Sequence, residues 1–324
     1  MTSQNIKSKG VRITGFGHYL PEKIVTNEEI ASYIQFPEMR PAEKAVIGDV
    51  NEGATQRHRA SETETVPFMA AEATKMALKD ANVSPEEVDL FILANWTDRE
   101  YIPDLAPQAS KLVGSERALA FDLATACTGF VHGVQTALMY LLAGNFKKAV
   151  VVGSERFSRR TRLKGYGEYT AGDAAAAVVL EKSDSPYGII DTFLKDYPDL
   201  EYIITCPGPK FFTKSYPDLI PNAIEYTLKA IEQMLENNSL SVDEVDWLVP
   251  HPGTFPVVKG VSQGTKIPKE KQLSNFHKVG NTSAASIPIV LSEYKHAGKF
   301  KEGDLFICPA VGGGWYSGGV VFTL

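Results

Sequence analysis

The sequence has few cysteines, no long apolar run and no excess of positive charge. Its 324 residues include only Cys127, Cys206 and Cys308, with no C-x-x-C pair. We therefore expect no disulfide framework, no zinc or other metal site, and a reducing cytoplasm as the compartment. No stretch approaches the ~20 apolar residues of a membrane span. The N-terminal MTSQNIKSKG also lacks the apolar core of a signal peptide.

The composition is that of an ordinary globular protein. Hydrophobic residues make up 44% of the chain and charged residues 22%, which allows one large or two medium domains with a substantial core. The formal net charge of −6 gives no electrostatic reason to expect a nucleic-acid partner.

Apolar runs alternate with helical patterns in the first half of the chain. Helices are expected over 66–81 and 128–144. Strands are expected over 11–20, 88–96, 118–126, 148–154 and 174–182. Continuous apolar strands separated by helices are typical of an α/β fold with buried strands.

The second half of the chain repeats features of the first. SPEEVDLFILANW at Ser84 is echoed by SVDEVDWLVPHPG at Ser241, 157 positions later. AGNFKKAVVV at Ala143 is echoed by AGKFKEGDLFI at Ala297, 154 positions later. Two matches in the same order predict a duplicated α/β unit, with the polar segment 181–188 as the junction.

The stretch DLATACTGFVHG places Cys127 among small residues, directly before a predicted helix. A helix N-terminus favours the thiolate, so Cys127 is a candidate nucleophile. The alternative is a small core residue, and position alone leaves both readings open. Cys308 lies in an apolar strand and is expected in the core, and Cys206 is expected in a turn.

Two further polar residues join Cys127 as candidates. The offset of 154 matches Cys127 to Asn281, which also precedes an apolar helix pattern. His251 ends the strand-like VDWLVP, where α/β proteins place ligand-binding groups. Asn281 could instead be a helix N-cap, His251 could be structural, and His277 is a rival histidine. The glycine-rich 311–319 could supply an oxyanion-binding backbone N–H.

Several motifs together resemble one family. They are GFGHYLPEKIVTNEEIA, FDLATACTGF, GDAAAAVVLEK, GNTSAASIP and GGGWYSGGVVF. With them the chain resembles β-ketoacyl-acyl-carrier-protein synthase III and its relatives, essentially end to end. The resemblance implies a thiolase-like fold, in which duplicated α/β halves form α-β-α-β-α layers. The halves would be 1–183, carrying Cys127, and 184–324, carrying His251 and Asn281.

The resemblance also implies residue roles and substrates. Cys127 would be acylated by a thioester, and His251 and Asn281 would stabilise the enolate formed when a malonyl thioester loses CO2. The backbone N–H groups of Cys127 and Gly314 would hold the acyl oxyanion. The substrates would ride on coenzyme A or on an acyl carrier protein, with no further cofactor.

The family is homodimeric, which assigns a role to the segment TDREYIPD. Residues near Ile102 would reach across the dimer to close the acyl pocket. Glu100 could act there as a second base, as in relatives that deprotonate a second acyl chain. The alternatives for this segment are an Arg99 that pairs with a carboxylated acyl chain and an ordinary solvated loop.

Two segments depart from the family pattern. The usual H-Q-A-N followed by an arginine is HPGTFPVV here, with Pro256 in the arginine's place. In the family, a tryptophan and a T-G-I-R segment bind coenzyme A. Residues 46–60 stand in their place here and keep Gly53, Arg57 and His58 of that pattern, but not the tryptophan. These departures predict a specialised relative with an altered donor-binding rim. The basic segment 156–170 is either a solvated face or a dock for a carrier protein or coenzyme A phosphates.

The predicted activity is an acyltransferase reaction: acyl loading of Cys127, then decarboxylative Claisen condensation, in fatty-acid or polyketide-type biosynthesis. A same-fold acyltransferase that passes the acyl group to an alcohol, an amine or a second acyl chain is the alternative. A cysteine hydrolase and an inactive partner subunit are weaker candidates, because the fold is duplicated and Cys127, His251 and Asn281 are all present.

Overall fold

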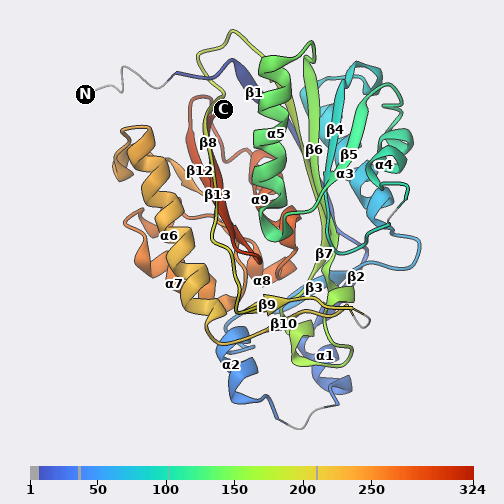
Figure 1. Cartoon of the computed structure of the whole chain (residues 1–324), viewed down its shortest axis with the longest axis vertical. Coiled ribbons are helices and arrows are strands. Elements are labelled where there is room, and N and C mark those ends of the chain that lie inside the picture. Colours follow the sequence, from blue (N-terminus) through green and yellow to red (C-terminus); the bar gives the residue numbers. More distant parts are fainter. Residues whose placement is uncertain (1–6, 36–37, 101, 209–210) are drawn as a thin grey trace.

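The protein is built from five stacked layers (Figure 1). The structure, a computed structural model, describes residues 7–35, 38–100, 102–208 and 211–324. Helices α6 and α7 cover one sheet, α5 and α9 lie between the two sheets, and α3 and α4 cover the other sheet. The predicted α-β-α-β-α architecture is therefore confirmed. The α-helices are α1 (Asn27–Tyr33), α2 (Pro41–Ile47), α3 (Val66–Ala81), α4 (Ala106–Val113), α5 (Gly129–Ala143), α6 (Leu219–Asn237), α7 (Phe255–Gly264), α8 (Phe276–Val279) and α9 (Ser286–His296).

The first sheet has the strand order β1-β7-β6-β4-β5. Its strands are β1 (Val11–Tyr19), β4 (Leu90–Ala94), β5 (Leu119–Leu123), β6 (Lys148–Arg156) and β7 (Asp173–Lys182). Strand β4 runs parallel to β5 and β6, and β7 runs antiparallel to β6 and β1. All five strands predicted in the first half are present.

The second sheet repeats this arrangement with the order β11-β12-β13-β8. Its strands are β8 (Ile189–Asp196), β11 (Trp247–Leu248), β12 (Leu305–Gly312) and β13 (Tyr316–Thr323). Strands β11 and β12 are parallel, and β13 is antiparallel to β12 and β8. A parallel bridge between Leu248 and Gln272 stands where β5 stands in the first sheet. The division at 183/184 stays a prediction, which the matching strand orders support.

Strands β4 and β11, and strands β6 and β12, begin 157 residues apart, so the offset around Cys127 is 157 and not 154. The 3₁₀ turns η2 (Ala126–Thr128) and η7 (Ser283–Ala285) precede α5 and α9 and are 157 residues apart. Each begins with a positive-φ residue, Ala126 at +46° and Ser283 at +52°. Cys127 therefore corresponds to Ala284, and Asn281 lies three residues before that position. The value of 154 arose because α9 ends about one turn earlier than α5, which displaces the A-G-x-F match.

Small residues let the central helices approach the first sheet closely. A Cβ on Gly129 would lie 2.9 Å from Ala94 Cβ, and one on Gly153 would lie 2.7 Å from the Ala284 carbonyl. Among the described residues, one helical stretch, Ala126–Ala143, is long and apolar enough to span a membrane. It contains α5, and half of it is buried in the protein core.

Short elements cover one end of the layers (Figure 1). Two small two-stranded antiparallel sheets lie there, one of β2 (Lys23–Thr26) and β3 (Gln56–Arg59), the other of β9 (Ile204–Thr205) and β10 (Lys214–Ser215). Helices α1 and α2 lie at the same end. Of these elements, α2, β9 and β10 line the site described next, together with η2.

Candidate active site

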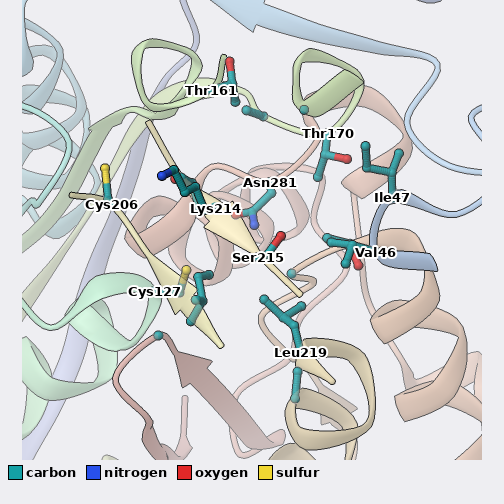
Figure 2. Close-up of a pocket in the computed structure, with 18 of the residues that line it drawn as sticks. Val46, Ile47, Cys127, Thr161, Thr170, Cys206, Lys214, Ser215, Leu219 and Asn281 are labelled. Carbon is teal, nitrogen blue, oxygen red and sulfur yellow. The ribbon is translucent and has the colours of Figure 1, made fainter. Parts of the chain in front are cut away.

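A cavity of about 700 Å³ brings the three predicted catalytic residues together. Cys127, His251 and Asn281 all line it. Cys127 is in η2 at the start of α5, Asn281 directly precedes η7, and His251 follows β11. Figure 2 shows Cys127 and Asn281 in the middle of the cavity, with Val46 and Ile47 of α2 to one side.

The Cys127 thiol is not held as a thiolate. Burial raises the pKa of Cys127 to about 12, and the negative charge of Glu155 acts in the same direction. A hydrogen bond from Ser283 Oγ, 3.6 Å from Cys127 Sγ, opposes the shift only in part. Desolvation thus opposes the effect of the helix N-terminus, which was expected to favour the thiolate. Acylation needs a group that accepts the thiol proton.

His251 is a neutral imidazole in this pocket. Its side chain is buried, with the residue 6% exposed, and burial lowers the pKa of His251 to about 3. Its backbone N–H donates to the Pro309 carbonyl at 2.9 Å, which ties the residue to β12. The ring Nδ1 is buried without a hydrogen-bond partner among the described residues. Such a ring can bind a substrate oxygen as a neutral donor.

Asn281 is held by hydrogen bonds at both its backbone and its side chain. Its backbone N–H donates to the Thr170 carbonyl at 2.7 Å, and its own carbonyl accepts from Gly172 N–H at 2.9 Å. Its Oδ1 accepts from the Ser283 backbone N–H at 2.7 Å. Because Oδ1 faces the backbone, the Nδ2 group is the part of the amide that can donate to a ligand.

The glycine-rich stretch 311–319 was expected to be a loop, but only residues 313–315 connect β12 to β13, and the rest belongs to the two strands. A Cβ on Gly312 would lie 3.1 Å from the Cys127 backbone nitrogen, so the end of β12 and η2 are in close contact. Gly313 lines the cavity, whereas Gly314 is not among its described lining residues. The Gly314 carbonyl accepts from Asp199 N–H at 3.0 Å. The oxyanion role of Gly314 stays a prediction.

Within one chain, Glu100 and Ile102 lie outside the cavity that Cys127 lines. Glu100 lines a second cavity, together with Arg156, Arg159 and Arg160. The Ile102 residue is 89% exposed, and neither it nor Glu100 is a described lining residue of the first cavity. Their predicted contribution across a dimer stays a prediction.

Sequence reasoning missed several residues at the site. Glu155, at the end of β6, and Ser283, inside the quoted GNTSAASIP, both lie next to Cys127. Cys206 was expected in a turn without a partner, but it follows β9 and lines the cavity. Cys308 is buried in β12 as predicted. His277 is exposed in α8 and is not a described lining residue.

The two segments that depart from the family pattern contact each other. A Cβ on Gly48 would lie 2.9 Å from the Pro256 ring, and one on Gly53 would lie 3.3 Å from Phe255 Cβ. The surviving Arg57 is fully buried and donates to the carbonyls of Val25, Ala54 and Tyr169. Arg57 therefore stabilises the fold beneath this rim.

Charged residues surround the cavity mouth. Arg40 and Glu43 form an ion pair at 2.7 Å, and both line the cavity with Arg162 and Lys214. Arg162 belongs to the basic segment 156–170, so part of that segment faces the pocket rather than open solvent alone. In the part of the chain that the structure describes, no group of three or more His, Cys, Asp or Glu is placed to hold a metal ion.

Comparison with known proteins decides the family. Residues 121–198 match the family described as 3-oxoacyl-(acyl-carrier-protein) synthase III, and residues 235–324 match its C-terminal domain family. The β-ketoacyl-(acyl-carrier-protein) synthase III of Aquifex aeolicus is 31% identical over 313 residues, covering 96% of this chain and 99% of that protein. The chain belongs to this family.

Other members of the synthase III family agree. The enzyme of Acidiphilium cryptum is 33% identical over 312 residues, covering 93% of this chain and 95% of that protein. The crystal structure of the Aquifex aeolicus synthase III superposes with a TM-score of 0.89, covering 97% of this chain and all of the other. The family, the thiolase-like fold and the acyltransferase class predicted from the sequence are confirmed.

A more distant structure shares the fold. The priming β-ketosynthase of a polyketide biosynthetic pathway superposes with a TM-score of 0.88 at 24% identity, covering all of this chain and 99% of the other. At this sequence identity the match shows only that the two proteins share a fold.

Proposed function

We propose that this protein loads an acyl group from a thioester onto Cys127 and condenses it with a malonyl thioester. The observation that carries the proposal is one cavity that holds a nucleophile candidate and two neutral donors, Cys127, His251 and Asn281. The donor and extender ride on coenzyme A or on an acyl carrier protein, and the protein works in the cytoplasm, where its three thiols stay free.

In the first half-reaction, the Cys127 sulfur attacks the thioester carbonyl, and the donor thiol leaves. The tetrahedral oxyanion needs backbone donors, and the Cys127 N–H is one candidate. The predicted second donor is Gly314, in the connection after β12, whose end contacts η2 through Gly312.

In the second half-reaction, the malonyl group loses CO2 and its enolate carbon attacks the acyl-Cys127 carbonyl. Negative charge develops on the thioester oxygen of the extender. His251 remains neutral at physiological pH, because burial lowers its pKa to about 3. A neutral imidazole and the Asn281 amide can therefore both donate to that oxygen, without a net charge that the pocket would have to bury.

The cavity mouth fits an anionic carrier. Arg40, Arg162 and Lys214 line it with one carboxylate, that of Glu43, close by. Coenzyme A phosphates and the phosphopantetheine arm of a carrier protein are both anionic, so cationic side chains at the rim support either.

A homodimer is supported by an unpartnered edge of the first sheet. Strand β5 ends the sheet, with Leu119 46% exposed, and α5 presents Met139 and Leu142 to solvent. An apolar helix face beside a bare sheet edge is typical of an interface with a second copy. In such a dimer, Glu100 and Ile102 could reach the partner subunit's pocket as predicted.

The test is intact-protein mass spectrometry after incubation with a panel of acyl-coenzyme A thioesters. We expect wild type to gain the mass of one acyl group and Cys127→Ala to gain none. Cys206→Ala is the matched control, because Cys206 lines the same cavity, and it should load like wild type. Loading of Cys127→Ala, or no loading from coenzyme A or carrier-protein donors, would contradict the proposal.

A further inference from the structure

A buried carboxyl group lies behind the Cys127 thiol. Glu155 in β6 is 0% exposed. Its Oε2 accepts from Thr97 Oγ1 at 2.7 Å and from the backbone N–H groups of Trp96 at 3.3 Å and Thr97 at 3.2 Å. Its Oε1 is equally buried and has no hydrogen-bond partner among the described residues. An unpaired buried carboxyl oxygen is costly, so a site that keeps one invites a functional explanation.

Ser283 connects this carboxyl group to the thiol. Its hydroxyl donates to Cys127 Sγ at 3.6 Å and accepts from Trp96 Nε1 at 2.8 Å. Ser283 also lies near Glu155 and acts to lower the pKa of the carboxyl group, although its hydroxyl is not in hydrogen-bonding geometry with Oε1 in this structure. The hydroxyl hydrogen therefore has one acceptor in hydrogen-bonding geometry, Cys127 Sγ, and a second, the Glu155 carboxyl group, nearby. A side-chain shift that brings the Ser283 hydroxyl onto Oε1 would satisfy the orphaned oxygen and present an Oγ lone pair to the thiol.

We propose that Ser283 and Glu155 form a proton relay for Cys127: as the sulfur is acylated, its proton passes to Ser283 Oγ while the Ser283 hydroxyl proton passes to Glu155 Oε1. The inference deepens the proposed function and rests on it for the acyl step. Ser283 touches the reacting sulfur and is the catalytic residue of the relay. Glu155 acts through Ser283 and is a positioning residue.

The bonds and protons of the relay balance over the two half-reactions. In acylation the Sγ–C bond forms, the donor's C–S bond breaks, and the departing thiolate takes a proton from solvent. In condensation the enolate carbon bonds to the acyl carbon, the Sγ–C bond breaks, and the proton held on Glu155 returns through Ser283 to Sγ. The proton taken from solvent is the one that decarboxylative condensation consumes overall.

The surroundings of Glu155 suit a group that changes charge near neutrality. Burial raises the pKa of Glu155 to about 7, and its hydrogen bonds only partly oppose this. In register with it on β7 is the apolar Ala174. The titratable and charged groups on the elements around it are Cys127 in η2, Asp98 after β4, Arg156 in β6 and Asp173 in β7. Asp98 and Arg156 pair with each other at 3.3 Å, and Asp173 accepts from Ser158 Oγ at 2.7 Å.

The test is the pH dependence of Cys127 alkylation by iodoacetamide, followed by peptide mass mapping because Cys206 is also a free thiol. With the relay, the rate depends on ionised Glu155 acting on the neutral thiol. It should rise up to about pH 7 and then level off, because the carboxyl group is fully ionised above its pKa of about 7. Without the relay, the rate follows the thiolate alone and rises about tenfold per pH unit up to the thiol pKa.

Glu155→Gln and Ser283→Ala should each lose the plateau and react about 10²-fold more slowly at neutral pH. Asp173→Asn is the matched control, because it also replaces a buried carboxyl group by an amide on the neighbouring strand. It should keep the plateau even if it lowers stability.

A plateau in wild type that both relay variants lose would establish the relay. A tenfold rise per pH unit in wild type would overturn it, even if the variants do not fold. An unchanged plateau in Glu155→Gln would also overturn it. Acyl loading is measured in a separate experiment. Acyl loading of Cys127 without a plateau in the alkylation rate would support the proposed function and contradict the relay. A plateau without acyl loading would support the relay and contradict the proposed function.

Discussion

At the scale of single residues, the pocket separates two tasks between two sets of side chains. In the proposed mechanism Cys127 carries the acyl group, while His251 and Asn281, which line the same cavity, act as neutral donors. His251→Ala should therefore still load an acyl group but lose about 10²- to 10³-fold in the rate of condensation, as when one oxyanion donor is removed. Quenched single-turnover mass spectrometry measures both steps. Loss of loading in His251→Ala would contradict this division.

A second prediction at this scale concerns stability. The pKa of Glu155 is raised to about 7 in the folded protein from 4.5, so the folded state holds a proton that the unfolded state releases between these values. Wild type should lose up to roughly 3 kcal/mol of unfolding free energy from this group as the pH rises through that window. Glu155→Gln should lack this loss. Chemical denaturation at about pH 5 and about pH 8 compares the two proteins. Equal pH dependence in both would contradict the buried-carboxyl description.

The sequence identified Cys127, His251 and Asn281 because each stands at the end of a strand or the start of a helix. It could not identify Glu155 as a neighbour of the thiol, since a glutamate after an apolar strand is ordinarily solvated. The charge state of the Cys127 thiol could not be predicted from the sequence either. Burial, which depends on the tertiary structure, opposes the local effect of the helix N-terminus.

At the scale of elements, the site depends on close packing between β6 and η7. Gly153→Ala would place a Cβ 2.7 Å from the Ala284 carbonyl and displace the turn that holds Ser283. We expect a loss of about 1–3 kcal/mol in unfolding free energy and slower acyl loading.

Gly298→Ala is the control for this substitution. Gly298 has a φ of +69°, so alanine is strained there, but nothing lies within 4 Å of a Cβ at that position. It should lower the free energy of unfolding without changing the loading rate. Denaturation curves and loading kinetics of both variants check the comparison. Normal loading in Gly153→Ala would show that η7 tolerates the shift.

The element scale also explains the error in the repeat offset. Strands β4 and β11, strands β6 and β12, and the η2 and η7 turns keep an offset of 157, but α9 is shorter than α5. The spacing between the similar stretches after the two helices depends on where each helix ends, not on the spacing of the equivalent strands. The duplication was therefore predicted, whereas the residue-by-residue match of Cys127 to Asn281 was not correct.

At the scale of the whole molecule, the exposed apolar side of α5 and the β5 edge predict a dimer. Met139→Lys with Leu142→Lys should halve the mass in solution, because it places charges on the proposed interface. Leu200→Lys is the control, since Leu200 is 85% exposed and lies elsewhere. Light scattering after size-exclusion chromatography measures the mass. A monomeric wild type, or a dimer that survives the double substitution, would contradict the interface.

The architecture was predictable over the whole chain because strand and helix patterns agree with the family motifs in both halves. The shape of the cavity was not, since much of its wall comes from α2, β9, β10 and α6, none of which carries a recognisable motif.

The most direct test of the central claim mixes preloaded acyl-enzyme with a malonyl thioester and follows the protein mass, CO2 and product together. The account predicts that Cys127 loses its acyl mass in step with CO2 release and that a β-ketoacyl thioester two carbons longer appears. Loss of the acyl group to another acceptor without CO2, or a stable acyl-enzyme, would contradict it.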